Sequence, residues 1–155
     1  MSYNTWHDYG YRICTDDLKE EISLVKLMKL IQLAPNLYEK VKEYIDTYYD
    51  GQITKTYDIL ESYVEDCGEN NYGGLAEIMY EVIKEVEGIE LYVCTDFDDA
   101  AYLIYPLIYP WQLKNMSDKE NNLTEEDLCK LYAKYLHVVT DENLVVEYKS
   151  VKNGG

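Results

Sequence analysis

The sequence predicts an α+β protein in which about five helices pack on a small, mostly antiparallel sheet of about four strands. Apolar residues recur at helical spacing in five segments, whereas four shorter segments are rich in β-branched and aromatic residues and are bounded by turn residues. Along the chain these elements follow the order β-αααα-ββ-α-β. Helices are thus segregated from strands, which is typical of the α+β class. The length of 155 residues suits a single domain covering residues 1–155.

The first half of the chain is predicted to hold one strand and four helices. The strand covers residues 9–14, and the first helix is expected to begin with Thr15 or Asp16 as N-cap and to reach about Leu33. Its inward residues are predicted to be Leu18, Ile22, Val25, Met28 and Leu33. The next helices are expected at residues 36–49, 55–66 and 75–87, and Gly88 fits the residue that closes the last of them.

The second half is predicted to hold three strands and one helix. Strands are expected at residues 89–95, 101–105 and 144–151, with an irregular or edge segment at 107–111 between two prolines. In the helix that runs to about His137, Thr124 is the expected N-cap and Asp127 occupies the acidic position of a capping box.

Composition excludes several classes of protein. The net charge is −16 and 47% of residues are apolar, so the chain is expected to fold and to repel nucleic acid and anionic membranes. No apolar run is long enough to span a bilayer, and the first ten residues lack the pattern of a secretory signal. The four cysteines are far apart and form no C-x-x-C pair, which favours reduced, mostly buried thiols in a cytoplasmic protein.

The negative charge is concentrated in the middle of the chain. Residues 58–99 contain 13 acidic residues and one basic residue, Lys84, so they carry −12 of the −16. Acidic residues at helical spacing form two stripes, and a third acidic group follows the strand at 89–95. These nine residues are the predicted partner-binding set: Asp58, Glu61 and Glu65; Glu77, Glu81 and Glu85; and Asp96, Asp98 and Asp99.

Each stripe places like charges about one helical turn apart, which destabilises a helix by about 0.2–0.5 kcal/mol per pair. Both helices forgo the lysine that would relieve this repulsion, which indicates selection for the charge itself. Carboxylates on two neighbouring helices would then approximate a row of phosphates. The alternative is a solvated acidic face that keeps the protein soluble.

No motif of a known catalytic class is present, so we expect no enzymatic activity and no cofactor. The two histidines, His7 and His137, belong to no metal or nucleophile motif. One arrangement leaves an alternative open, because carboxylates at strand ends are ligands for Mg²⁺ or Ca²⁺. This alternative is a divalent-metal protein or hydrolase that uses Asp16, Asp17, Asp96, Asp98, Asp99 and Asp141.

Three segments resemble small uncharacterised acidic proteins of bacterial mobile elements and phages. They are residues 8–17 (DYGYRICTDD), the helix start at 123–128 (LTEEDL) and the closing residues 146–155 (VEYKSVKNGG). Small acidic proteins of that setting include anti-CRISPR inhibitors and other DNA mimics, which occupy the basic channels of nucleases. The resemblance implies an inhibitor of that kind, and its motifs carry no catalytic residues.

The leading hypothesis is therefore a non-enzymatic binding module that docks its acidic face on the nucleic-acid channel of a nuclease. The expected partner is a basic, nucleic-acid-binding enzyme, with no direct binding to nucleic acid or membrane. Besides the metal-dependent alternative, the sequence also fits an interaction subunit without inhibitory role, which would assemble as a homo-oligomer through tyrosines and Trp111.

Overall fold

The computed structural model describes residues 5–70, 72–96, 100–106 and 123–154, with the backbone alone for residues 5–9, 106 and 148–154. The described strands form one antiparallel sheet of four strands in the order β2–β3–β1–β4. Their bounds are Thr5–Cys14 (β1), Tyr92–Thr95 (β2), Ala101–Pro106 (β3) and Glu147–Gly154 (β4). Helices and strands are segregated, so the α+β class is confirmed.

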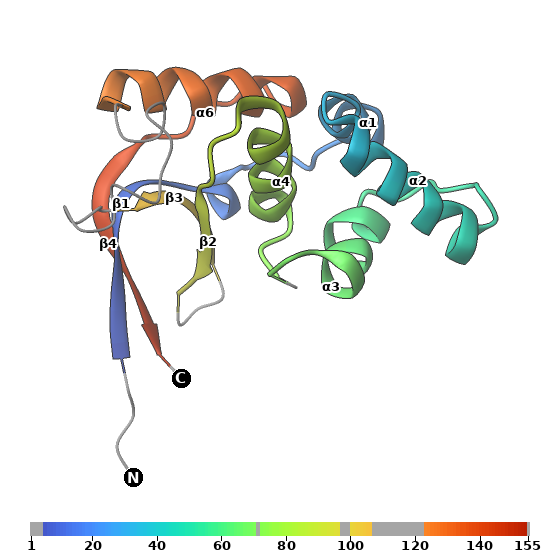
Figure 1. Ribbon diagram of the computed structural model, residues 1–155, viewed down its shortest axis with the longest axis horizontal. Coiled ribbons are helices and arrows are strands. Elements are labelled where there is room, and N and C mark those ends of the chain that lie inside the picture. Colours follow the sequence, from blue (N-terminus) through green and yellow to red (C-terminus); the bar gives the residue numbers. More distant parts are fainter. Residues whose placement is uncertain (1–4, 71, 97–99, 107–122, 155) are drawn as a thin grey trace, which may run out of the picture.

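The first and last strands are partners along the whole length of β4. Thr5 of β1 is paired with Gly154 of β4, and Arg12 is paired with Glu147 at the other end of the ladder. Figure 1 shows these two strands extending together away from the helices. The two ends of the sequence are thus tied by backbone hydrogen bonds.

The helices form a layer on the sheet and a second group beyond it (Figure 1). Helix α6 (Glu125–Val139) and helix α4 (Leu75–Glu87) contact the strands directly. Helices α1 (Leu24–Gln32) and α2 (Pro35–Tyr49) pack against α4 on its other side. The π-helical turn η2 (Asp58–Tyr63) packs on α2 and continues into the short helix α3 (Val64–Cys67), and the buried residues of both belong to the same core as those of α4. Helix α4 is therefore enclosed by elements on several sides.

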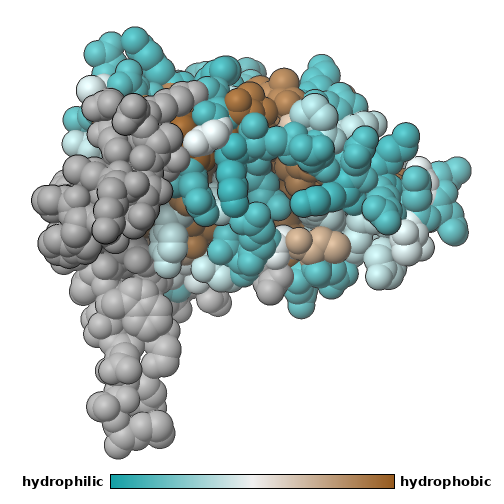
Figure 2. Space-filling view, viewed as in Figure 1, coloured by the Kyte–Doolittle hydropathy of each residue, from teal (hydrophilic) through white to brown (hydrophobic). Residues whose placement is uncertain are grey.

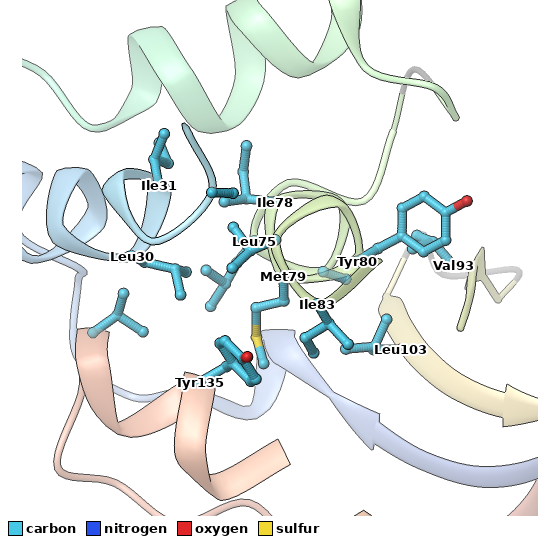
Figure 3. Close-up of a cluster of buried hydrophobic side chains, with 14 of the residues drawn as sticks. Leu30, Ile31, Leu75, Ile78, Met79, Tyr80, Ile83, Val93, Leu103 and Tyr135 are labelled. Carbon is cyan, nitrogen blue, oxygen red and sulfur yellow. The ribbon is translucent and has the colours of Figure 1, made fainter. Parts of the chain in front are cut away.

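Figure 3 shows how α4 centres the hydrophobic core. Its residues Leu75, Ile78, Met79 and Ile83 point toward side chains of α1, α6 and the sheet. Residues 75–80 are all buried, which requires a helix that is covered almost all round rather than one with a single apolar stripe. The core residues drawn from other elements are Leu30, Ile31, Val93, Leu103 and Tyr135.

The first helix begins later than the sequence predicts. Residues 15–17 form one 3₁₀ turn (η1), and residues 18–23 are irregular before α1 starts behind the N-cap Ser23, whose hydroxyl accepts from the Lys26 N–H. The reason is tertiary, because the N–H groups of Lys19 and Glu20 donate to the Glu142 carboxylate instead of to helix carbonyls. The buried residues of α1 are Leu27, Leu30 and Ile31. The inward positions predicted for Val25 and Leu33 are therefore wrong, and both side chains are exposed.

Other predicted elements agree with the structure more closely. Helix α4 has the predicted bounds, and Gly88 after it adopts the left-handed conformation expected of a closing glycine. The capping box of α6 is confirmed, since the Thr124 hydroxyl accepts from the Asp127 N–H and the Asp127 carboxylate accepts from the Thr124 N–H. The segment at 107–111, with Trp111, lies outside the described residues.

Candidate functional site: an acidic groove

A groove of about 1280 Å³ opens where the sheet edge, η1, η2 and α3 come together. One side is made by η1 and the irregular residues 18–23, and the opposite side by residues 54–57 with η2 and α3. The two sides are joined where the Thr56 hydroxyl donates to the Ile22 carbonyl at 2.7 Å. Residues 72–75, with Thr95 and Ala101 at the ends of β2 and β3, complete the lining.

Acidic side chains dominate the charged lining of this groove. Five carboxylates line it against one lysine, Lys55, and all six of these side chains are exposed. The carboxylates are those of Asp16, Glu20, Glu21, Glu61 and Glu65. Carboxylates gathered in one concavity reinforce each other's field and attract cations more strongly than scattered surface acids do.

Two exposed tyrosines also line the groove. Tyr57 is 65% exposed and Tyr72 is 42% exposed, and the Tyr72 hydroxyl donates to the Val93 carbonyl at 3.2 Å. Aromatic faces beside carboxylates suit the side chains of arginine and lysine, because these cations are attracted to the ring quadrupole as well as to the negative charge. The groove is thus built for cationic groups.

The two predicted stripes have different environments. Glu61 and Glu65 are exposed and line the groove, and Asp58, at the start of η2, is partly buried. The stripe on α4 is predicted to face a partner, but it is turned inward, and for Glu77 this prediction is wrong. Glu77 has no exposed surface, whereas Glu81 and Glu85 are partly buried. The cause is that α4 is covered by η2, α3 and α2 on the side that carries these glutamates.

Glu85 has a structural role that the sequence analysis missed. Its two carboxylate oxygens accept from the N–H groups of Asn36 (2.9 Å) and Leu37 (3.0 Å) in the first turn of α2. The N-cap position of α2 is Ala34, whose side chain cannot accept a hydrogen bond. A carboxylate from a neighbouring helix supplies the missing acceptor and the favourable charge for that helix end.

Glu77 and Glu81 form a buried carboxylate pair. Burial raises the pKa of Glu77, and hydrogen bonds from Asn70 and Glu69 oppose that effect. Burial also raises the pKa of Glu81, to about 7, with the charge of Glu77 as the next cause. The Asn70 amide donates to Glu77 Oε2 at 2.6 Å. Glu77 therefore belongs to the interior, and Glu81 keeps one carboxylate oxygen buried beside it.

The strand-end aspartates fall near each other but are used by the backbone. Strands β1 and β2 both pair antiparallel with β3, so their ends lie at one edge of the sheet. Asp16 accepts from the Ala101 N–H at 2.9 Å, and Asp96 accepts from the Ala100 N–H at 3.0 Å. Asp17 and Asp141 are exposed, and Asp98 and Asp99 lie outside the described residues.

Within the part of the chain that the structure describes, no group of three or more His, Cys, Asp or Glu side chains is arranged to hold a metal ion. Of the four thiols, Cys94 is buried, Cys14 is partly buried, and Cys67 and Cys129 are exposed, so the prediction of mostly buried thiols is wrong. None of the helices in the described ranges is long and apolar enough to cross a membrane.

Two groove acids, Glu20 and Glu21, were missed because they were assigned to a continuous first helix. Ser23 followed by Leu24, Leu27, Leu30 and Ile31 is the signal that places the helix start later, because these apolar residues keep helical spacing from a capping serine. With that start, the two glutamates fall in the segment that borders the groove.

Comparison of the chain with protein-family models, with curated proteins and with solved structures finds no match.

Proposed function

We propose that this protein is an acidic binding module that takes a cationic segment of a partner protein into the groove. The observation that carries the proposal is the lining itself, with five exposed carboxylates, one lysine and two exposed tyrosines in one concavity. The volume exceeds the roughly 300–1,000 Å³ of sites for small molecules, which favours a polypeptide segment as the occupant.

The partner that fits this chemistry presents lysine or arginine on an extended segment or loop. Charge complementarity would guide the two proteins together and would make association sensitive to salt. Hydrophilic residues cover most of the described surface in Figure 2, so on that face recognition by charge is favoured over recognition by a broad apolar patch.

Inhibition of a nucleic-acid enzyme is the more specific form of this proposal. Segments that hold the phosphate backbone in nucleases are rich in lysine and arginine, so a groove that binds such a segment would compete with the nucleic acid. The protein would act without catalysis, by occupying a basic site. Its net charge of −16 supports this direction, because the protein itself repels nucleic acid.

The decisive experiment compares two double variants with the same change in net charge and the same residue spacing. Glu61→Gln/Glu65→Gln removes two groove acids, and Glu39→Gln/Glu43→Gln removes two exposed acids from α2, which do not line the groove. Binding of a fluorescent arginine-rich peptide is measured by anisotropy at several salt concentrations. The groove variant is expected to bind about tenfold more weakly, a loss of about 1.4 kcal/mol, and the α2 variant to change less than twofold.

Equal losses in the two variants would mean that net charge alone attracts the peptide, and the groove would not be the site. The inhibitor form is tested separately by capture from a bacterial lysate at low salt. It predicts that a nucleic-acid enzyme binds the native chain, is released by high salt or by duplex DNA, and is not captured by the groove variant. Capture that DNA does not disturb would contradict it.

A further inference from the structure

The interior of the helical layer contains two acidic side chains whose hydrogen bonding is incomplete. Glu77 Oε1 and Glu81 Oε2 are buried, and neither has a hydrogen-bond partner within the described residues. The two side chains lie one turn apart on α4, and Glu77 is wholly enclosed. A buried carboxylate with an unsatisfied oxygen is strongly unfavourable when it is ionised, so the pair needs a positive charge or a proton.

The segment that follows η2 covers this pair. The backbone at Gly68 lies so close that an added Cβ would be 3.3 Å from Glu77 Cγ, and the Asn70 amide donates to Glu77 Oε2. Five charged or titratable groups on α4 itself and on neighbouring elements interact with the pair. These are Tyr63 of η2, Cys67 of α3, Glu69 after α3, Lys40 of α2 and Lys84 of α4.

The nearby cations do not neutralise the pair. Lys40 and Lys84 lower the pKa of Glu81, but burial and the charges of Glu77 and Glu69 outweigh them. The Lys84 ammonium lies 3.4 Å from Glu69 and 3.8 Å from Glu90, so its closest carboxylates are elsewhere. Tyr63 shares the unfavourable surroundings, since burial and then the charge of Glu81 raise its pKa.

A proton satisfies the pair better than a metal ion does. The described part of the chain brings no third His, Cys, Asp or Glu side chain into a metal-binding group, and Glu77 and Glu81 do not line the acidic groove. One shared proton removes a negative charge and turns an orphaned acceptor into a donor. The hydrogen bonds that Glu77 receives from Asn70 favour its ionised form, so Glu81 is the carboxyl group that holds the proton.

We propose that Glu77 and Glu81 form a proton-dependent latch, in which one proton held by the pair keeps η2, α3 and residues 68–70 packed on α4. When the proton is lost, two enclosed negative charges repel each other and this segment loosens. The latch is independent of any ligand, so it stands or fails apart from the proposed function. It nevertheless acts on the segment that carries Glu61 and Glu65 of the groove.

The latch is tested by following stability and local opening with pH. Urea unfolding at pH 5.5 and at pH 8 gives the unfolding equilibrium constant, and amide hydrogen exchange, corrected for the intrinsic effect of pH, reports on residues 63–70. A group whose pKa is raised by folding loses its stabilising effect as pH rises, because the folded state then releases a proton that the unfolded state has already lost. The unfolding constant of the native chain is therefore expected to rise at least tenfold at pH 8.

Glu81→Gln is the diagnostic variant, because the amide has the shape of the protonated acid and donates a hydrogen bond at every pH. It is expected to remove the extra destabilisation and the faster exchange at pH 8. Glu77→Gln is the second variant, with the same expectation. Glu39→Gln/Glu43→Gln, which alters exposed acids of α2, is expected to keep the native pH profile.

Three outcomes would overturn the proposal. The first is an unchanged pH profile in both single variants, and the second is failure of both variants to fold, because the neutral amide imitates the protonated state. The third is stabilisation of the native chain at pH 8 by millimolar Mg²⁺ or Ca²⁺ that Glu81→Gln abolishes, since the pair would then hold a metal ion.

Discussion

The two acidic stripes have nearly the same sequence pattern and opposite surroundings. Glu61 and Glu65 are exposed on the segment η2–α3 and line a groove, whereas Glu77 and Glu81 on α4 are turned toward that same segment from the inside. Glu85 completes the inner stripe as the acceptor for the start of α2. Helical spacing of like charges therefore indicates which residues share a face, but it does not indicate whether that face is solvated.

The difference follows from how each helix is covered. The charged face of η2 and α3 borders the groove, and the apolar residues Ile59, Tyr63 and Val64 are buried. Helix α4 lies between the sheet and helices α1 and α2 (Figure 1), and its residues Glu77, Glu81 and Glu85 are less exposed than Glu61. Acidic residues in the most enclosed helix serve the fold, whereas Glu61 and Glu65 on the outer segment are exposed at the groove.

The largest difference in stability between the two stripes is expected when a glutamate is replaced by arginine, which reverses the charge and enlarges the side chain. Glu77→Arg must fit a guanidinium into a site with no exposed surface, so we expect a loss of about 3 kcal/mol or more in the free energy of unfolding. Glu61→Arg is its matched control and is expected to change stability by less than about 0.5 kcal/mol. Urea denaturation measures both, and similar losses in the two variants would contradict the burial assigned to α4.

A smaller effect is expected when the cap of α2 is removed. Glu85→Ala leaves the N–H groups of Asn36 and Leu37 without their side-chain acceptor, at a cost of about 1–2 kcal/mol. Glu61→Ala, which removes an exposed carboxylate, serves as the control. Urea unfolding gives the difference, and faster hydrogen exchange at residues 36 and 37 would locate it. If Glu85→Ala left the free energy of unfolding unchanged, water would be replacing this carboxylate as the acceptor, and the expected role of Glu85 would be contradicted.

The smallest effect concerns exposed carboxylates that titrate in the opposite direction. Hydrogen bonds from the N–H groups of Lys19 and Glu20 lower the pKa of Glu142 below its ordinary value of 4.5. Its contribution is therefore complete above that value and is lost as pH falls through the folded-state pKa. Glu142→Gln is expected to make acid unfolding less steep below pH 4.5 without altering the profile above pH 5.5. If the pH dependence of unfolding below pH 4.5 were the same in Glu142→Gln and in the native chain, this role of Glu142 would be contradicted.

Much of the fold was predictable because local signals agreed with the tertiary contacts. The bounds of α4, the glycine that closes it and the capping box of α6 follow from residues that act within one helical turn. The start of α1 was not predictable in the same way, because Glu142, more than 120 positions away, binds the backbone at Lys19 and Glu20. Long-range acceptors of this kind leave no periodic pattern in the sequence.

The candidate site was predictable in part. The acidic segment 58–99 contains Glu61 and Glu65, which the structure brings to the groove. Their companions Asp16, Glu20 and Glu21 come from a distant part of the chain, so charge counted along the sequence cannot group them. For Glu77 a signal was present, since the apolar residues next to it in the sequence, from Leu75 to Tyr80, fall on more than one face of α4 and indicate an enclosed first half of the helix.

The most direct test of the account compares the two stripes in one binding measurement. Glu61→Gln/Glu65→Gln and Glu77→Gln/Glu81→Gln each replace two carboxyl groups at the same spacing, and only the first pair lines the groove. Anisotropy with an arginine-rich peptide is measured at pH 6, below the pKa of about 7 to which burial raises Glu81. The account predicts about tenfold weaker binding for the first variant and less than a twofold change for the second. Equal losses, or a larger loss in the second variant, would contradict it.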